Sequence, residues 1–399
     1  MATHLYLRHT EGYYKRHLVG TDAMKVAVLG SGMMGTVIAS DLARSGAVDE
    51  VVAADIDEER LRNLKRTAGT RKLSTAVLDV RNEAKLGRFL KGFDVVSSAL
   101  PHGSVHPADV AAVRSGSKLV NIAFEDEQML LASEARKKGA LLIPGCGVAP
   151  GLGAILLAHG CRELSGAEEG HIMVGGLPQK PRSPYGYRLV FSIVGLLREY
   201  TDPARVVRSG RVVRVKPFDE VREVEFPAPI GKCEGFFTDG LASLIYSTKG
   251  LKEMDEMTLR WPGHAEKMKL LIDGGFLSEA PVRVGDQKVS PLAFSRALLS
   301  RELSEGEPED VTVMRVQVKG RGRQILYDMV DYYDEKSRVT SMGKTTGYTG
   351  SIVTQMVGNG EVEGRGVIPP ETAIQGEAVG KLLAELEKRG VKVSETREG

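Results

Sequence analysis

The segment that most constrains the fold is an apolar run followed at once by closely spaced glycines. Residues 25–29 read Lys-Val-Ala-Val-Leu, and Gly30-Ser-Gly-Met-Met-Gly35 follows directly. This pattern predicts a buried strand, a tight turn and the start of a helix. Gly30 permits the turn, Gly32 allows a pyrophosphate to approach the backbone, and Gly35 lets the helix lie close to the strand. The free N–H groups of the helix start then face the phosphates.

The residues after the turn distinguish a nucleotide site from a glycine turn with a purely structural role. A second predicted strand, residues 51–54, ends on Asp55. A carboxylate roughly 20 residues beyond the glycines is placed to bind the adenosine ribose hydroxyls. Asp55 and Asp57 put negative charge where a 2′-phosphate would lie, whereas Arg60 and Arg62 weaken that preference. The sequence therefore predicts NAD rather than NADP as the cofactor.

Strands and helices alternate up to residue 143. Predicted strands at 74–78, 94–99, 118–122 and 140–143 are separated by helices at 58–67, 86–90, 107–115 and 128–138. This alternation predicts a parallel, doubly wound sheet. The carboxyl ends of such strands line the ligand crevice, so we expect the cofactor to contact residues at the turn and at the strand ends. The predicted cofactor contacts are Gly30, Gly32, Met33, Met34, Gly35, Asp55, Asp79, Val80, Ala99, Leu100, Pro101 and His102.

Length, charge and cysteine content limit the classes of protein. At 399 residues the chain is long enough for two domains. Lys and Arg total 54 against 52 for Asp and Glu, so neither nucleic acid nor an acidic membrane surface is an expected partner. No apolar stretch approaches the ~20 residues of a membrane span. Three scattered cysteines fit neither a disulfide framework nor a zinc site, so we expect a reducing cytoplasm and no metal.

The pattern changes beyond a Pro- and Gly-rich loop at residues 144–151, which we expect to link cofactor and substrate domains. Cys146 in this loop is expected to be a packed residue rather than a nucleophile. Strand-like segments then dominate, at 171–174, 206–215, 221–226, 257–261, 311–318, 324–333 and 337–342. Their period-two alternation predicts an open, mixed or antiparallel sheet. Helices at 193–200 and 291–300, or a second subunit, would cover it, so we expect a homodimer or higher homo-oligomer.

The predicted fold class is α/β: a Rossmann doubly wound parallel sheet plus an α+β domain for substrate binding and dimerisation. Helices predicted at 349–357 and 376–389 are expected to return to the Rossmann domain. The chain then divides into an N-terminal extension (1–23), the NAD-binding domain (24–150), the substrate domain (151–344) and the C-terminal helices (345–399). The extension does not resemble a secretory signal, and Met24 directly before the first strand also fits a later start of translation.

Polar side chains that suit amino-acid chemistry gather between residues 184 and 264. Oxidation of an amino acid needs a cation for its carboxylate, a carboxylate for its ammonium group and a base. We predict His264 as the base and Asp239 as a second catalytic residue. Both also fit helix-capping positions, and Tyr187 and Arg188 also fit surface packing. The predicted substrate contacts are Tyr187, Arg188, Arg260 and Glu125.

Five short segments, spread in order through both domains, carry a family resemblance. They are Gly-Val-Ala-Pro-Gly at 147–151, Val-Gly-Gly-Leu-Pro at 174–178, Tyr-Thr-Asp-Pro-Ala at 200–204, Gly-His-Ala-Glu-Lys at 263–267 and Gly-Val-Ile-Pro-Pro-Glu at 366–371. From Met24 onward the sequence resembles the saccharopine dehydrogenase-like superfamily, most closely its lysine 6-dehydrogenase branch. The resemblance implies NAD-dependent oxidative deamination of L-lysine at the ε-carbon. The product would be 2-aminoadipate 6-semialdehyde, which cyclises to piperideine-6-carboxylate, with release of ammonia.

Two other functions stay open. A reductase of the saccharopine or carboxynorspermidine type would join an amine to a carbonyl compound, and Arg188 and Arg198 would supply a further cationic clamp. The other is a non-catalytic NAD-sensing protein, against which the polar residues of the second domain argue. For the lysine reaction, an amine with a pKa near 10.4 must lose its proton before it gives up hydride. Such an enzyme must lower that pKa or work best in alkaline solution.

Overall fold

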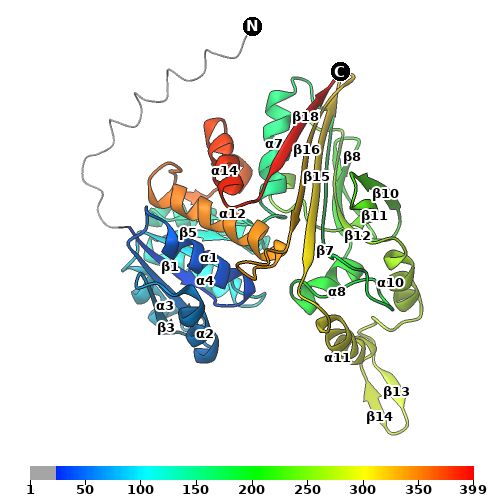
Figure 1. Cartoon of the computed structure of the whole chain (residues 1–399), viewed down its shortest axis with the longest axis horizontal. Coiled ribbons are helices and arrows are strands. Elements are labelled where there is room, and N and C mark those ends of the chain that lie inside the picture. The colour runs from blue at the N-terminus through cyan, green and yellow to red at the C-terminus, as the bar shows by residue number, and fades with distance from the viewer. Residues whose placement is uncertain (1–23) are drawn as a thin grey trace.

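The computed structural model describes residues 24–399, so the predictions made for residues 1–23 lie outside the described residues. The chain builds two large sheets that stand side by side, one in the nucleotide domain and one in the second domain (Figure 1). A two-stranded hairpin, β13 (Val282–Val284) and β14 (Gln287–Val289), projects away from both sheets (Figure 1). None of the helices within residues 24–399 combines the length and apolar character needed to cross a bilayer.

The first sheet is the predicted doubly wound parallel sheet. Its seven strands have the order β17-β6-β5-β4-β1-β2-β3. Helices cover both faces of this sheet, so its strands are buried and consist largely of valine, alanine and leucine. The strands are β1 (Lys25–Leu29), β2 (Glu50–Asp55), β3 (Leu73–Val77), β4 (Val95–Ser98), β5 (Lys118–Asn121), β6 (Leu141–Ile143) and β17 (Gly366–Val367).

The helices of the nucleotide domain follow the predicted alternation, with one difference. The helix predicted at 128–138 is two helices, which meet at Leu131. The Rossmann helices are α1 (Met33–Arg44), α2 (Glu58–Ala68), α3 (Glu83–Leu90), α4 (Val105–Ser115), α5 (Glu127–Leu130) and α6 (Ala132–Lys138).

The longest of the C-terminal helices lies against α1, β4 and β5 of the nucleotide domain (Figure 1). α12 (Ser341–Gly358) packs along α1 so closely that a Cβ on Gly347 would come within 2.8 Å of Val37. The strand predicted at 337–342 is wrong, because Thr340 caps α12 with its side chain on the N–H of Gly343. α13 (Pro370–Ala373) and α14 (Glu377–Lys388) follow.

The second sheet is mixed and mostly antiparallel, as predicted. Its main strand order is β10-β11-β12-β7-β15-β16-β18, and only the β7–β12 pair is parallel. The strand predicted at 206–215 is a hairpin that turns at Ser209 and Gly210, both with positive φ. The strands are β7 (Glu169–Pro178), β8 (Ala204–Arg208), β9 (Arg211–Val215), β10 (Val221–Phe226), β11 (Gly231–Phe237), β12 (Glu253–Arg260), β15 (Asp310–Gly320), β16 (Arg323–Tyr332) and β18 (Val393–Glu398).

The loop at 144–151 leads into α7 (Leu152–Glu163), which packs against the second sheet. A Cβ on Gly160 would come within 2.8 Å of Val318, so this glycine allows the close approach. Cys146 is buried, and burial raises the pKa of its thiol, as expected for a packed residue. The remaining helices are α8 (Ile193–Thr201), α9 (Leu244–Ser247), α10 (His264–Asp273) and α11 (Pro291–Ser304). One apolar core therefore extends from the first sheet to the second.

Candidate functional site

The glycine turn has the geometry of a nucleotide cradle. Gly30 has φ +94°, and a Cβ there would lie 2.5 Å from the carbonyl oxygen of Ala99. A Cβ on Gly35 would overlap the carbonyl of Gly30, so α1 lies against the turn. A Cβ on Gly32, in contrast, would meet nothing within 4 Å, which leaves space beside the helix start. This chain's turn therefore fits the pyrophosphate of a pyridine nucleotide.

Asp55 closes one side of this cradle. Its Oδ2 accepts hydrogen bonds from the N–H (2.6 Å) and hydroxyl (2.8 Å) of Ser31, and Oδ1 accepts one from the N–H of Asp57 (2.9 Å). Burial raises the pKa of Asp55, but these hydrogen bonds outweigh burial and lower the pKa overall. The carboxylate is therefore ionised at the end of β2, where the adenosine ribose is expected. A cavity of about 390 Å³ lies beside it, lined by Ser31, Gly32, Met33, Thr36, Arg60, Asn63, Leu64 and Thr67.

The other predicted cofactor contacts lie at the carboxyl ends of the neighbouring strands or at the start of α1. Asp79 follows β3 and is paired with Arg81, with 2.7 Å between Oδ2 and Nη2. Hydrogen bonds from Arg81 lower the pKa of Asp79 to about 2. Met33 is half exposed at the start of α1, beside Met34. Val80 is buried after β3, and Ala99, Leu100, Pro101 and His102 follow β4.

His102 and Glu125 form a pair at the cofactor edge of the sheet. They follow β4 and β5, which are adjacent strands, and 3.0 Å separates Nδ1 of His102 from Oε1 of Glu125. The His102 side chain is 46% exposed and that of Glu125 is 17% exposed. Among residues 24–399, Nε2 of His102 has no hydrogen-bond partner. With the Glu125 carboxylate as acceptor for Nδ1–H, Nε2 of this half-exposed ring is the nitrogen that can accept a proton, an arrangement that suits a general base.

Asp239 takes part in a bridge between the two domains. Its two oxygens accept hydrogen bonds from Nε of Arg205 at 2.9 and 3.0 Å. Nη1 of Arg205 reaches both oxygens of Asp126 at 2.9 Å, and the hydroxyl of Tyr246 donates to Asp126 as well. The alternative interpretation of Asp239 as a helix cap is wrong, since the helix that follows starts at Leu244. Sequence reasoning missed Arg205 and Asp126, because no local motif marks them.

His264 lies in the interior of the second domain. It is 1% exposed, its Nδ1 lies 2.8 Å from the carbonyl oxygen of Tyr185, and its Nε2 lies 2.8 Å from the hydroxyl of Tyr200. Burial, followed by the nearby Arg260 charge, lowers its pKa to about 3. Nδ1 therefore donates to the carbonyl and Nε2 accepts from Tyr200, so no nitrogen is free for a substrate proton. This geometry does not fit the predicted role of His264 as the base, nor a capping role, since Gly263 is the N-cap of α10.

The predicted substrate contacts are divided between the two regions. Arg260 is 1% exposed, and its Nη2 lies 2.6 Å from Oε2 of Glu199. Its guanidinium lies 4.4 Å from the ring centre of Tyr187, which is also buried. Arg188, the next residue after Tyr187, is partly buried. The structure thus pairs Glu125 with His102. It links Asp239, through Arg205, to Asp126, the residue after Glu125. Arg260 and Tyr187 belong instead to the buried cluster around His264.

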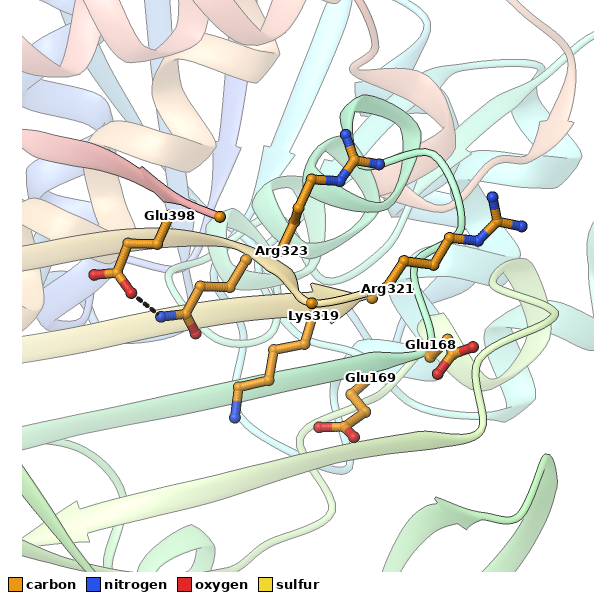
Figure 2. Close-up of a pocket in the computed structure, with 10 residues that line it drawn as sticks. Glu168, Glu169, Lys319, Arg321, Arg323 and Glu398 are labelled. Atoms are coloured by element: carbon orange, nitrogen blue, oxygen red, sulfur yellow. Dashed lines mark hydrogen bonds between the residues drawn. The ribbon is translucent and has the colours of Figure 1, made fainter.

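A second cavity, of about 480 Å³ compared with 390 Å³ for the one beside Asp55, lies in the second domain (Figure 2). It surrounds the turn between β15 and β16, at the end of β15 opposite to Asp310, whose carboxylate holds the start of α12. Figure 2 shows basic and acidic side chains around it: Lys319, Arg321, Arg323, Glu168, Glu169 and Glu398. This cavity is separate from the cofactor edge. Within residues 24–399, no group of three or more His, Cys, Asp or Glu side chains is arranged to hold a metal ion.

Comparisons with known proteins agree with this architecture. Residues 26–143 match the model of the saccharopine dehydrogenase NADP-binding domain, and residues 147–391 match that of the saccharopine dehydrogenase C-terminal domain. The mitochondrial alpha-aminoadipic semialdehyde synthase of Mus musculus is 23% identical, over 92% of this chain and 47% of that protein. The saccharopine dehydrogenase [NADP(+), L-glutamate-forming] of Saccharomyces cerevisiae is 25% identical, over 68% of this chain and 62% of that protein. The chain thus spans about half to three fifths of these relatives.

Solved structures share the fold. The apo saccharopine dehydrogenase (L-Glu forming) from Saccharomyces cerevisiae superposes with a TM-score of 0.78 at 20% identity, covering 94% of this chain and 100% of that one. The homospermidine synthase of Legionella pneumophila, in complex with NAD, gives 0.65 at 12% identity, covering 94% and 91%. The C-terminal-domain model alone covers more than half of the sequence, and the nucleotide-binding model covers most of the remainder. The chain therefore belongs to the saccharopine dehydrogenase-like family of oxidoreductases that use a pyridine nucleotide.

Proposed function

We propose that the protein is an NAD-dependent dehydrogenase that deaminates L-lysine at its ε-carbon. The observation that carries the proposal is the His102–Glu125 pair, which places a proton acceptor at the carboxyl ends of β4 and β5 beside the glycine turn. An amine must be neutral before it loses hydride, so a base at this position is what the reaction needs. The name of the mouse relative contains the semialdehyde that the proposed reaction forms.

In the proposed reaction His102 acts first. Its Nε2 accepts a proton from the ε-ammonium group, and the Glu125 carboxylate on Nδ1–H stabilises the imidazolium that results. A nicotinamide bound at the glycine turn supplies the hydride acceptor for the hydrogen on C6. Water then adds to the iminium carbon, the C–N bond breaks, and the semialdehyde and an ammonium ion leave. The proton on His102 passes to solvent, so one lysine, one water and one NAD⁺ would yield one aldehyde, one ammonium ion, one NADH and one proton.

NAD is the cofactor that we propose. The support is the ionised carboxylate of Asp55 at the end of β2, which would repel a 2′-phosphate. Arg60, which would attract such a phosphate, is paired with Asp57 at 3.2 Å. The matching family model and the yeast relative are both named for NADP, so the two cofactors must be compared directly.

A second candidate is a reductase that joins an amine to a carbonyl compound, as the name of the yeast saccharopine dehydrogenase suggests. The structural match between this chain and the solved yeast enzyme extends over the whole of the yeast chain. The same His102–Glu125 pair would then return a proton to the new amine. This reaction needs space for a second substrate with its own carboxylates.

One assay separates these functions. Purified protein is mixed with NAD or NADP and a panel of L-lysine, L-ornithine, L-glutamate and saccharopine, and the absorbance of the reduced cofactor is followed. Turnover with lysine and release of ammonia support the first proposal. Turnover with saccharopine, or oxidation of reduced cofactor by an amine plus a carbonyl compound, supports the second instead. Cofactor binding with no turnover in either direction would indicate a sensor.

We further propose that the chain forms a homodimer. Apolar side chains are exposed on the segments that precede and follow the projecting hairpin in sequence, among them Leu270, Phe276 and Phe294, each at least 53% exposed. Burial of such side chains against a second copy would stabilise the hairpin, since an isolated two-stranded hairpin is marginal in water. Light scattering coupled to size-exclusion chromatography tests this assembly, and a monomer would contradict it.

A further inference from the structure

The loop between β5 and α5, residues 122–126, carries two groups that matter for the site. Glu125 pairs with His102, and its neighbour Asp126 binds Arg205 of the second domain. A loop that positions a base must be held in one conformation, because a displacement of about 1 Å in a reacting group can cost on the order of 100-fold in rate. In the structure, buried side chains hold the backbone of this loop by hydrogen bonds.

Three fully buried polar side chains lie under the loop. Asp109 is on α4, Asn121 ends β5 and Gln128 is on α5, and each is 0% exposed. Nδ2 of Asn121 donates to Oδ1 of Asp109 at 3.0 Å, and Nε2 of Gln128 donates to Oδ2 at 2.7 Å. The carboxylate of Asp109 thus joins two side-chain amides that come from different elements.

The same two amides hold the loop backbone with their oxygens. Oδ1 of Asn121 accepts the N–H of Ala123 at 2.9 Å, and Oε1 of Gln128 accepts the N–H of Glu125 at 2.8 Å. Backbone N–H groups only donate, so both amide oxygens must face the loop and both amide nitrogens must face Asp109. Only a group that accepts on both of its oxygens satisfies this arrangement.

We propose that Asp109 is a positioning residue, which acts through Asn121 and Gln128 to hold Glu125 against His102. This inference rests on the proposed function for its catalytic part, whereas the hold on the loop itself can be measured without any activity. Asp109 makes no hydrogen bond to the loop and lies below the sheet edge, so sequence motifs give no indication of its role.

The substitution Asp109→Asn separates this role from packing. Asparagine has nearly the same shape, but it accepts on one oxygen only, so its NH₂ group meets an amide nitrogen of Asn121 or Gln128. To relieve this clash one amide must rotate, and its oxygen then leaves the N–H of Ala123 or of Glu125. Gln128→Met is a second variant, which removes the acceptor for Glu125 and leaves the Asp109–Asn121 bond in place. Asp41→Asn is the matched control: Asp41 also accepts from two donors, Ser351 and Arg389, but on α1, away from this loop.

Amide hydrogen exchange of the full chain, read by mass spectrometry, gives the first test. Asp109→Asn and Gln128→Met should both speed exchange in the peptide that contains residues 121–128, whereas Asp41→Asn should not. Unchanged exchange in that peptide for both variants would overturn the proposal, whether or not the protein deaminates lysine.

Kinetics give the second test. We expect Asp109→Asn to lower kcat by about 10-fold or more, with KM for NAD unchanged. In a Glu125→Gln background the same substitution should change kcat by less than about 2-fold, because the group that Asp109 positions is already disabled. Equal losses in both backgrounds would show a general structural effect and would overturn the positioning role. If wild-type protein turns over no amino acid, the proposed function fails, and the exchange experiment alone decides whether Asp109 holds the loop.

Discussion

Oε1 of Glu125 lies 3.0 Å from Nδ1 of His102, and the two residues follow adjacent parallel strands. If His102 is the base, His102→Ala should lower kcat by about 100-fold or more, since a positioned base contributes roughly 10²–10⁴-fold. Glu125→Gln should act in the same direction with a smaller loss. NAD affinity, measured by titration calorimetry, should stay within about 2-fold for Glu125→Gln, because Glu125 is not among the predicted cofactor contacts.

His159 supplies the control for that experiment. It lies on α7, where its ring contacts Tyr327 at 6.3 Å between ring centres. His159→Gln removes a histidine without touching the cofactor edge, so kcat should remain that of the wild type. A His102→Ala variant with full activity would rule out the pair as the site of proton transfer.

His264 should matter for stability rather than for catalysis. Its folded-state pKa of about 3 lies below the ordinary value of 6.5, so protonation favours the unfolded chain. The stability that neutral His264 contributes is present above pH 6.5 and is lost as the pH falls toward about 3. Urea unfolding of wild type and His264→Gln over this range should show the two curves converging toward acid. Parallel stability curves, or a loss of kcat in His264→Gln without a loss of stability, would contradict this prediction and indicate that His264 acts in catalysis.

Glu256 gives an opposite dependence on pH. It is buried, and the hydroxyl of Thr238 donates a hydrogen bond to it. Burial, together with the nearby charges of Glu199 and Asp239, raises its pKa to about 8, although the hydrogen bond from Thr238 acts in the opposite direction. Since the folded pKa exceeds the ordinary value of 4.5, ionisation opposes folding as the pH rises from 4.5 to about 8. Glu256→Gln should therefore be more stable than the wild type at about pH 9, with less advantage at about pH 5. A difference in unfolding free energy that does not vary with pH would contradict this account.

The Asp126–Arg205–Asp239 bridge should hold the two domains together at the cofactor edge. Arg205→Gln leaves two carboxylates facing each other, so we expect kcat/KM for the amino acid to fall about 10-fold or more. The control is an exposed ion pair, with 2.9 Å between Nζ of Lys232 and Oε1 of Glu223. Lys232→Gln should leave both kcat/KM and the radius of gyration unchanged. Small-angle scattering should show a larger radius of gyration for Arg205→Gln, and an unchanged radius with unchanged kinetics would refute the bridge.

Asp55 should set the choice of cofactor. Asp55→Asn keeps the shape of the side chain but removes the negative charge that lies beside Ser31. The ratio of kcat/KM for NAD to that for NADP should fall by about 10-fold, a change that corresponds to about 1.4 kcal/mol, because the charge that repels a 2′-phosphate is lost. Measurement of kcat/KM with NAD and with NADP, for the wild type and for Asp55→Asn, checks this prediction. The same ratio in both proteins would show that other residues set the cofactor selectivity.

The sequence was most informative where local patterns decide the structure. The glycine turn, the alternation of strands and helices and the position of Asp55 follow from short-range rules, and the strand order of the first sheet agrees with them. The strand predicted at 337–342 failed because Thr340 caps a helix whose burial depends on α1, which is about 300 residues away in sequence. β18 was missed because its sequence, Val-Ser-Glu-Thr-Arg-Glu, is polar and it lies at the edge of the sheet.

The site was harder to predict than the fold, for a physical reason. His264 has the sequence setting of a base, after a strand and a turn, but Tyr200 and Tyr185 come from other elements and occupy both of its nitrogens. His102 and Glu125 were predicted separately, as cofactor and substrate contacts, and only the pairing of β4 with β5 joins them. Contacts between distant segments decide which polar residues are free to react, and single-sequence patterns do not contain them.

The route of the chain also bears on its synthesis. β17, at residues 366–367, completes the edge of the first sheet beside β6, and β18 covers β16 of the second sheet only after that. On the ribosome, neither sheet can be completed until residues 366–398 have been made, although β1 to β6 precede them by more than 200 residues. The edges of β6 and β16 therefore stay unpaired until β17 and β18 have been synthesised, and during this interval they are exposed to aggregation.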